Sequence, residues 1–88
     1  MKVYIASYED NLSSESTNGI TGVYKNIQDA RDKIKENYKK EIENIKRKDC
    51  DSIFYEYTEV VEDDYWEIRS TFDEFYYMSE SVETYELL

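Results

Sequence analysis

Carboxylates are the side chains with which this 88-residue chain could do chemistry, and they are unevenly distributed along it. Residues 49–88 contain thirteen Asp and Glu and one basic residue, Arg69, whereas residues 1–48 contain ten Lys and Arg against eight acids. The net charge of −10 therefore divides into +2 for the first part and −12 for the second. Such carboxylates can act as general acids and bases, bind hard cations or present fixed negative charge to a basic partner.

Acid–base catalysis is the least supported of these chemistries. It needs two carboxyl groups whose environments separate their pKa values, and a crowded acidic surface gives its members similar environments. The chain contains no His, which excludes Ser-His and Cys-His pairs. Cys50, the only cysteine, lies between Asp49 and Asp51, which disfavour a reactive thiolate. We therefore expect no catalytic residues and a protein that is not an enzyme.

Metal and cofactor sites have little support either. Glu62, Asp63 and Asp64 are consecutive, whereas an EF-hand loop has acids at alternate positions and a Gly at its turn. Weak surface binding of Ca²⁺ or Mg²⁺ is the most that this run predicts. Gly19 and Gly22 are the only glycines, and no phosphate-binding loop contains them. We expect no cofactor and no dedicated metal site.

Direct nucleic-acid binding would have to use the Lys-rich segment at residues 31–48. Four acids are interleaved with its eight Lys and Arg, so that half of its positive charge is offset. Pairs such as Glu36 and Lys40, four residues apart, are typical of a solvated helix surface with salt bridges. We expect no direct contact with nucleic acid.

The acidic second part is expected to be folded, because disordered acidic tails are poor in aromatic and β-branched residues. Ile, Val, Phe, Tyr and Trp occur throughout residues 53–85. This part therefore carries its charge on ordered structure. A single domain, residues 1–88, is expected, because a chain of this length has room for one core.

Hydrophobic periodicity predicts the elements that position the carboxylates. Residues 2–8 alternate as a strand does, and residues 19–25 supply a second strand that pairs with the first as an antiparallel hairpin. Asn26 is a favourable N-cap for a helix of about 22 residues. The apolar stripe of this helix recurs at steps of three or four and consists of Ile27, Ala30, Ile34, Tyr38, Ile42 and Ile45.

Residues 52–61, 65–71 and 75–86 are rich in β-forming side chains and predict two or three further strands. Acidic turns are expected at residues 62–64 and 72–74. The alternative for the last segment, residues 75–86, is that part of it forms a helix. The predicted fold class is α+β. It has an antiparallel sheet of four or five strands with one long helix packed on one face, in the order β-β-α-β-β with an optional further strand.

No apolar run approaches the roughly 20 residues of a membrane-spanning helix. Residues 1–6 are too short an apolar stretch for a signal peptide. The expected location is the cytoplasm, with no membrane partner.

Acids and tyrosines of the second part form the predicted partner-binding surface. Residues on one face of a strand repeat every 6.6–6.8 Å, roughly, so acids on two neighbouring strands approximate the phosphate spacing of about 3.4 Å along a DNA strand. Steps of three between several of the acids divide them over two faces or two patches. The predicted residues are Glu56, Glu59, Glu62, Asp63, Asp64, Tyr65, Glu67, Asp73, Glu74, Tyr76, Tyr77, Glu80 and Glu83.

The aromatic rings among these acids have two interpretations. Tyr65, Trp66, Tyr76 and Tyr77 have the composition of interface anchors. The alternative is that the rings fill the sheet face against the helix, and it is favoured for Trp66 and Phe75.

Three segments carry a resemblance to known proteins: residues 1–5 (Met-Lys-Val-Tyr-Ile), residues 22–24 (Gly-Val-Tyr) before the helix, and residues 75–80 (Phe-Tyr-Tyr-Met-Ser-Glu). They resemble a set of small bacterial and phage proteins with strand-strand-helix-strand organisation. In size and charge the chain is also similar to phage-encoded inhibitors of host defence. These include anti-CRISPR proteins and DNA-mimic inhibitors of restriction enzymes and DNA glycosylases.

The resemblance implies a stoichiometric phage-type inhibitor that evades host defence. Its expected partner is a basic host protein, a nuclease or CRISPR effector, whose nucleic-acid-binding groove the acidic surface blocks in the host cytoplasm. The chain would act as a monomer or a homodimer. The alternative is a structural or regulatory module, for example a homo-oligomer, whose acidity serves solubility alone.

Overall fold

The computed structural model of the chain describes residues 1–11, 16–47, 56–71 and 76–87. These residues form five strands and one helix in the order β-β-α-β-β-β. The elements are β1 (Lys2–Asn11), β2 (Ser16–Tyr24), α1 (Ile27–Arg47), β3 (Tyr57–Val61), β4 (Tyr65–Ser70) and β5 (Tyr77–Glu86). The predicted α+β class, with one long helix packed on one face of an antiparallel sheet, is confirmed.

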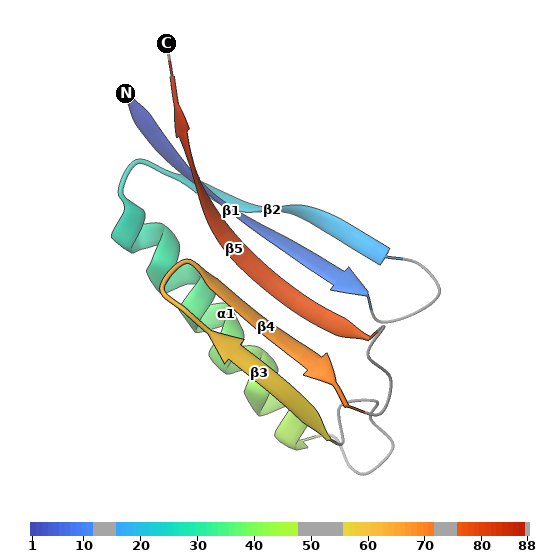
Figure 1. Ribbon diagram of the computed structural model, residues 1–88. Coiled ribbons are helices and arrows are strands. Elements are labelled where there is room, and N and C mark those ends of the chain that lie inside the picture. Colours follow the sequence, from blue (N-terminus) through green and yellow to red (C-terminus); the bar gives the residue numbers. More distant parts are fainter. Residues whose placement is uncertain (12–15, 48–55, 72–75, 88) are drawn as a thin grey trace.

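All five strands belong to one antiparallel sheet with the order β2-β1-β5-β4-β3 (Figure 1). β1 and β2 form the predicted hairpin, and β3 and β4 pair across the predicted turn at residues 62–64. The last strand, β5, lies between β1 and β4 and so joins the two hairpins. The edges of the described sheet are therefore β2 and β3.

Both strands of the first hairpin are longer than predicted, and β2 begins at Ser16 rather than at residue 19. β1 continues to Asn11 rather than ending at residue 8, because β5 pairs with it from Lys2 to Asn11. β5 is a strand as far as Glu86, so the alternative of a partly helical last segment is wrong. The predicted turn at 72–74 and the first residues of the predicted strand 52–61 lie outside the described residues.

The predicted N-cap and apolar stripe of α1 are both confirmed. Asn26 Oδ1 accepts a hydrogen bond of 2.8 Å from the backbone N–H of Gln28, which satisfies one of the free donors of the first turn. Ala30 and Ile34 are buried, and the other members of the stripe pack against the core. No helix among the described residues is long and apolar enough to cross a membrane.

The core lies between α1 and one face of the sheet. Alternate residues of the three central strands point into it, and those that are buried are Ala6, Trp66, Ile68, Met78 and Val82. The rings of Trp66 and Tyr38 are 5.6 Å apart between centroids and tilted by 56°. Trp66 is 3% exposed, so its interpretation as a core side chain is confirmed. Phe75 lies outside the described residues.

Candidate protein-interaction surface

The sheet has a second face, opposite α1, which no described element covers (Figure 1). We call it the open face. Strand alternation and the observed register place one acid on it from each of β1, β4 and β5. The residues of the open face that matter here are Ser7, Glu9, Tyr65, Glu67, Arg69, Tyr77, Ser79, Ser81, Glu83 and Tyr85.

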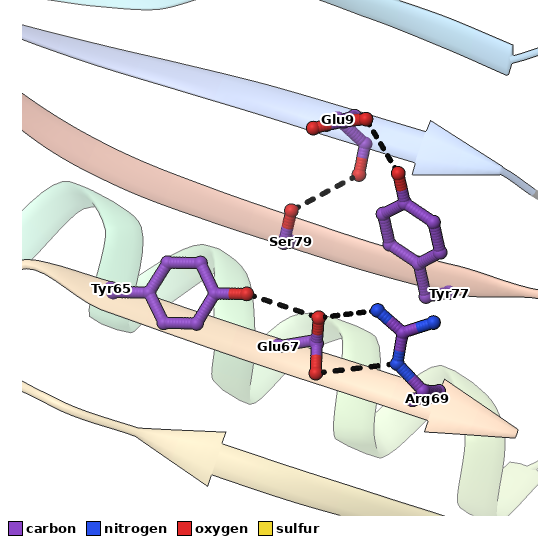
Figure 2. Close-up of polar contacts among 6 residues, drawn as sticks. All are labelled: Glu9, Tyr65, Glu67, Arg69, Tyr77 and Ser79. Carbon is purple, nitrogen blue, oxygen red and sulfur yellow. Dashed lines mark hydrogen bonds and ion pairs between the residues drawn. The ribbon is translucent and has the colours of Figure 1, made fainter. Parts of the chain in front are cut away.

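Glu67, in the middle of β4, is held from both sides on its own strand (Figure 2). Arg69 donates to both carboxylate oxygens, at 2.8 Å from Nη2 and 3.5 Å from Nε, and the Tyr65 hydroxyl donates at 3.0 Å. The hydrogen bond from Arg69, with that from Tyr65, lowers the pKa of Glu67. Burial and the bond to Glu67 together raise the pKa of Tyr65 to about 12. Glu67 is thus a fixed, ionised carboxylate at neutral pH.

The other two acids of the open face also bond to tyrosine hydroxyls. Tyr77 donates to Glu9 at 2.5 Å across the β1–β5 pair (Figure 2), and Tyr85 donates to Glu83 at 2.7 Å along β5. These bonds raise the pKa of Tyr77 and of Tyr85, because an ionised phenol beside a carboxylate is disfavoured. Each acid of the open face is therefore oriented by a phenol that stays protonated.

A hollow of about 590 Å³ lies on the open face between these tyrosine–glutamate pairs. Ser7, Ser79 and Ser81 line its centre, and the Ser7 and Ser81 hydroxyls are 3.4 Å apart. Small side chains on the adjacent strands β1 and β5 leave this space between the longer side chains around it. Arg69 lies over the Tyr77 ring, 4.5 Å from its centroid. The result is a concave surface with acids along its sides.

The β3–β4 turn carries further acids at one end of the sheet, on the side of α1. Its backbone is tied to β5 by a 2.8 Å hydrogen bond from the Val82 N–H to the Asp64 carbonyl oxygen. The turn therefore lies next to Glu83, the neighbour of Val82. The Asp64 carboxylate pairs with Arg31 of α1 at 2.5 Å, whereas Glu62 and Asp63 are exposed.

Of the other predicted surface residues, Glu59 and Glu80 lie on the helix side of the sheet. Glu59 points to the helix side of β3, where it accepts a hydrogen bond of 2.6 Å from the Tyr38 hydroxyl. Glu56 is exposed just before β3, and Tyr76 is half-buried just before β5. Glu80 is 5% exposed under α1, so its predicted place on the acidic surface is wrong. Alternation along β5 explains this, because Val82 and Glu80 share the helix side.

Two of the predicted residues, Asp73 and Glu74, lie outside the described residues. The structure brings together Tyr65, Glu67, Tyr77 and Glu83 on the open face. Glu62 and Asp63 instead line a hollow on the helix side of the sheet, with Arg31 and Tyr38 of α1. The predicted phosphate-like row on two neighbouring strands is wrong for the described residues, since β4 and β5 each place one acid on this face.

Sequence reasoning missed Glu9 and Arg69, which complete this surface. Glu9 belongs to the nearly neutral first part of the chain, so the uneven charge distribution does not indicate it. Extending the alternation of Val3 and Ile5 to residue 9 would have placed it on the same face. Its proximity to Tyr77 depends on the pairing of β1 with β5.

No group of three or more potential ligand side chains that could hold a metal ion occurs within the described ranges. Comparisons of the chain with protein-family models, curated proteins and solved structures found no match.

Proposed function

We propose that the chain is a phage-type inhibitor that blocks the basic nucleic-acid-binding groove of a host defence protein, a nuclease or CRISPR effector. The observation that carries this proposal is the set of three glutamates, Glu9, Glu67 and Glu83, on one uncovered sheet face, each bonded to a tyrosine hydroxyl. Carboxylates held in place lose little conformational freedom on binding, which favours association with Lys and Arg. The resemblance in size and charge to anti-CRISPR proteins and DNA mimics agrees with this role.

The surface would act by electrostatic complementarity rather than by copying the spacing of phosphates. The negative surface attracts a basic groove over about one Debye length, about 8 Å at physiological salt. Tyr65 and Tyr77 lie between the acids and supply amphipathic rings of the kind that dominate interface energetics. Charge would set the rate of association, and the rings would set its specificity.

Competition for DNA tests the proposal. Purified protein is added to labelled DNA bound by a panel of nucleases, restriction enzymes, DNA glycosylases and CRISPR effectors, at low and at moderate salt. We expect displacement from at least one of them, weaker at moderate salt. The double variant E9K/E83K should lose it by about tenfold or more, because each of two rim charges is reversed.

A matched control is D32K/E43K, which makes the same change in net charge on the exposed side of α1. It should retain displacement. If no enzyme of the panel releases its DNA, or if both double variants behave alike, the open face is not an inhibitory surface.

One observation favours the alternative of a homo-oligomer. Ile20 and Val23 of the edge strand β2 are 64% and 59% exposed, and an exposed apolar edge strand invites pairing with a second copy. Mass measurement across a dilution series distinguishes the two functions. A dimer that persists on dilution and is lost in I20K/V23K would favour the oligomer over a monomeric inhibitor.

A further inference from the structure

A separate pocket of about 330 Å³ lies on the helix side of the sheet, between α1 and strands β1, β2 and β5. Its lining includes three acids, Asp10, Glu41 and Glu80, two aromatic rings, Tyr8 and Trp66, and the polar side chains of Thr21 and Asn37. None of these residues faces the hollow of the open face except Tyr8, which borders both. The pocket is therefore a second site, with its own set of polar groups.

Glu80 is the most deeply placed charge of this pocket. Its Oε2 accepts hydrogen bonds from the Thr21 hydroxyl at 2.7 Å and from the Asn37 amide at 3.1 Å. The β1–β2 pairing has a bulge at Thr21: its neighbours Ile20 and Gly22 pair with β1, and Thr21 does not. The bulge allows the Thr21 side chain to turn toward Glu80. Two protein groups thus orient one oxygen of a carboxylate that is 5% exposed.

The other oxygen of this carboxylate accepts no hydrogen bond of ordinary geometry from a described residue. Among the described residues, Glu80 Oε1 and Trp66 Nε1 are both buried without a hydrogen-bond partner. They face each other across the β4–β5 pair. Burial raises the pKa of Glu80, and the bonds from Thr21 and Asn37 and the nearby Trp66 indole offset part of that rise. A buried acceptor of this kind costs free energy until a donor reaches it.

No ion pair among the described residues neutralises Glu80. Tyr8 of β1 is paired with Glu80, and Asp10 lies two residues further along β1, on the same face. Burial raises the pKa of Asp10 as well. Lys40 also lines the pocket, but its ammonium lies 3.1 Å from the Glu36 carboxylate on the next turn of α1. Two desolvated carboxylates therefore share a space whose nearby ammonium is engaged elsewhere.

We propose that this pocket binds a guanidinium cation, with Glu80 Oε1 accepting from it and the rings of Tyr8 and Trp66 lying against it. A guanidinium fits better than an ammonium, because it is planar, more weakly hydrated and able to stack on aromatic faces. Glu80 Oε1 is covered in the structure, so entry requires outward rotation of a lining side chain. Tyr8 is 36% exposed and does not belong to the buried core, so we expect it to be the side chain that rotates.

Nuclear magnetic resonance of the Trp66 indole N–H gives a site-specific test, since Trp66 is the only Trp in the chain. The protein is titrated with methylguanidinium at millimolar concentrations, far below those that unfold proteins. Methylurea, which has a similar shape and no charge, is the control ligand. We expect a saturable shift with methylguanidinium and none with methylurea.

The variant E80Q should weaken binding by about tenfold or more, because a neutral amide replaces the charged acceptor. E43Q, on the exposed side of α1, is the matched control and should bind as the wild type does. Circular dichroism tests whether E80Q is folded. If E80Q is unfolded, the variant D10N replaces it in the titration and should also weaken binding. Absence of a saturable shift in the wild type, an equal response to methylurea, or full affinity in both E80Q and D10N would overturn the proposal.

Two sources of a guanidinium are possible: a free small molecule and an arginine side chain of a protein partner. A blocked Gly-Arg-Gly peptide in the same titration separates them. Tighter binding of the peptide than of methylguanidinium supports an arginine side chain, and tighter binding of methylguanidinium supports a small molecule. Either result supports recognition of the cation, and neither depends on inhibition by the open face.

Discussion

Glu80 and Glu67 show how one side-chain type acquires opposite properties on the two faces of a sheet. Burial under α1 raises the pKa of Glu80, whereas the hydrogen bond from Arg69, together with that from Tyr65, lowers the pKa of Glu67. In the folded protein Glu80 therefore takes up a proton at a higher pH than in the unfolded chain. Glu67 takes it up at a lower pH, so the two residues link stability to pH with opposite signs.

These shifts predict that mild acid stabilises the protein. The contribution of Glu80 to the free energy of unfolding is fully present below its ordinary pKa of 4.5 and is lost as pH rises through its raised pKa in the folded protein. The raised pKa of Asp10 acts in the same direction. The contribution of Glu67 is lost only as pH falls below the ordinary range. We expect a higher urea midpoint at about pH 5 than at about pH 7, measured by circular dichroism.

E80Q should reduce this difference between the two pH values, because the titrating group is gone. E83Q retains the buried carboxylate and should show the wild-type difference. The assignment to Glu80 is contradicted if E80Q and E83Q respond to pH equally.

At the scale of the elements, α1 depends on the sheet for its stability. One apolar stripe packs on the strands, while the exposed side carries ordinary helix pairs such as Glu36 with Lys40 at 3.1 Å. Such pairs contribute only about 0.2–0.5 kcal/mol each, so burial of the stripe and the N-cap hold the helix in place. The tilted contact between Tyr38 and Trp66 joins α1 to β4.

Removal of the N-cap should be measurable in the whole protein. Replacing Asn26 by Ala leaves the Gln28 N–H without its acceptor, and we expect the free energy of unfolding to fall by about 0.5–2 kcal/mol. Urea denaturation followed by circular dichroism measures it. Replacement by Asp supplies the same acceptor and should leave stability nearly unchanged. Equal losses in both variants would mean that the cap does not stabilise α1.

The whole molecule is a two-layer structure of 48 × 24 × 16 Å with a net charge of −10. In a body this thin every charge lies close to others, so like charges repel across both faces. The described ion pairs are few and engage acids of the turn, of α1 and of β4. Net self-repulsion therefore opposes the compact state.

Salt should relieve this repulsion. Raising ionic strength from about 0.01 M to about 0.15 M shortens the Debye length from about 30 Å to about 8 Å. We expect an increase in stability of about 1 kcal/mol, which corresponds to about 4–8 °C in melting temperature for a domain of this size. Differential scanning calorimetry measures it. E9K/E83K carries less negative charge and should gain less, and an unchanged melting temperature in the wild type would contradict the prediction.

Local patterns in the sequence determined the elements and the fold class, because alternation, helical periodicity and capping depend on residues that are near one another. Asn26, the apolar stripe of α1 and the acidic turn at residues 62–64 are recognisable without any long-range contact. The same patterns predicted Tyr65, Glu67, Tyr77 and Glu83 as members of a surface. They could not predict where each strand would lie in the sheet.

Only the tertiary structure decided which carboxylates meet. Insertion of β5 between β1 and β4 brings Glu9 to Tyr77, 68 residues away in the chain. The same register buries Glu80 under α1 and leaves Glu83, three residues later, on the open face. Strand register is set by side-chain packing and hydrogen bonds between distant segments, and a shift of one residue exchanges the two faces. For that reason the charge of the second part is readable in the sequence, and its division between a surface and a buried pocket is not.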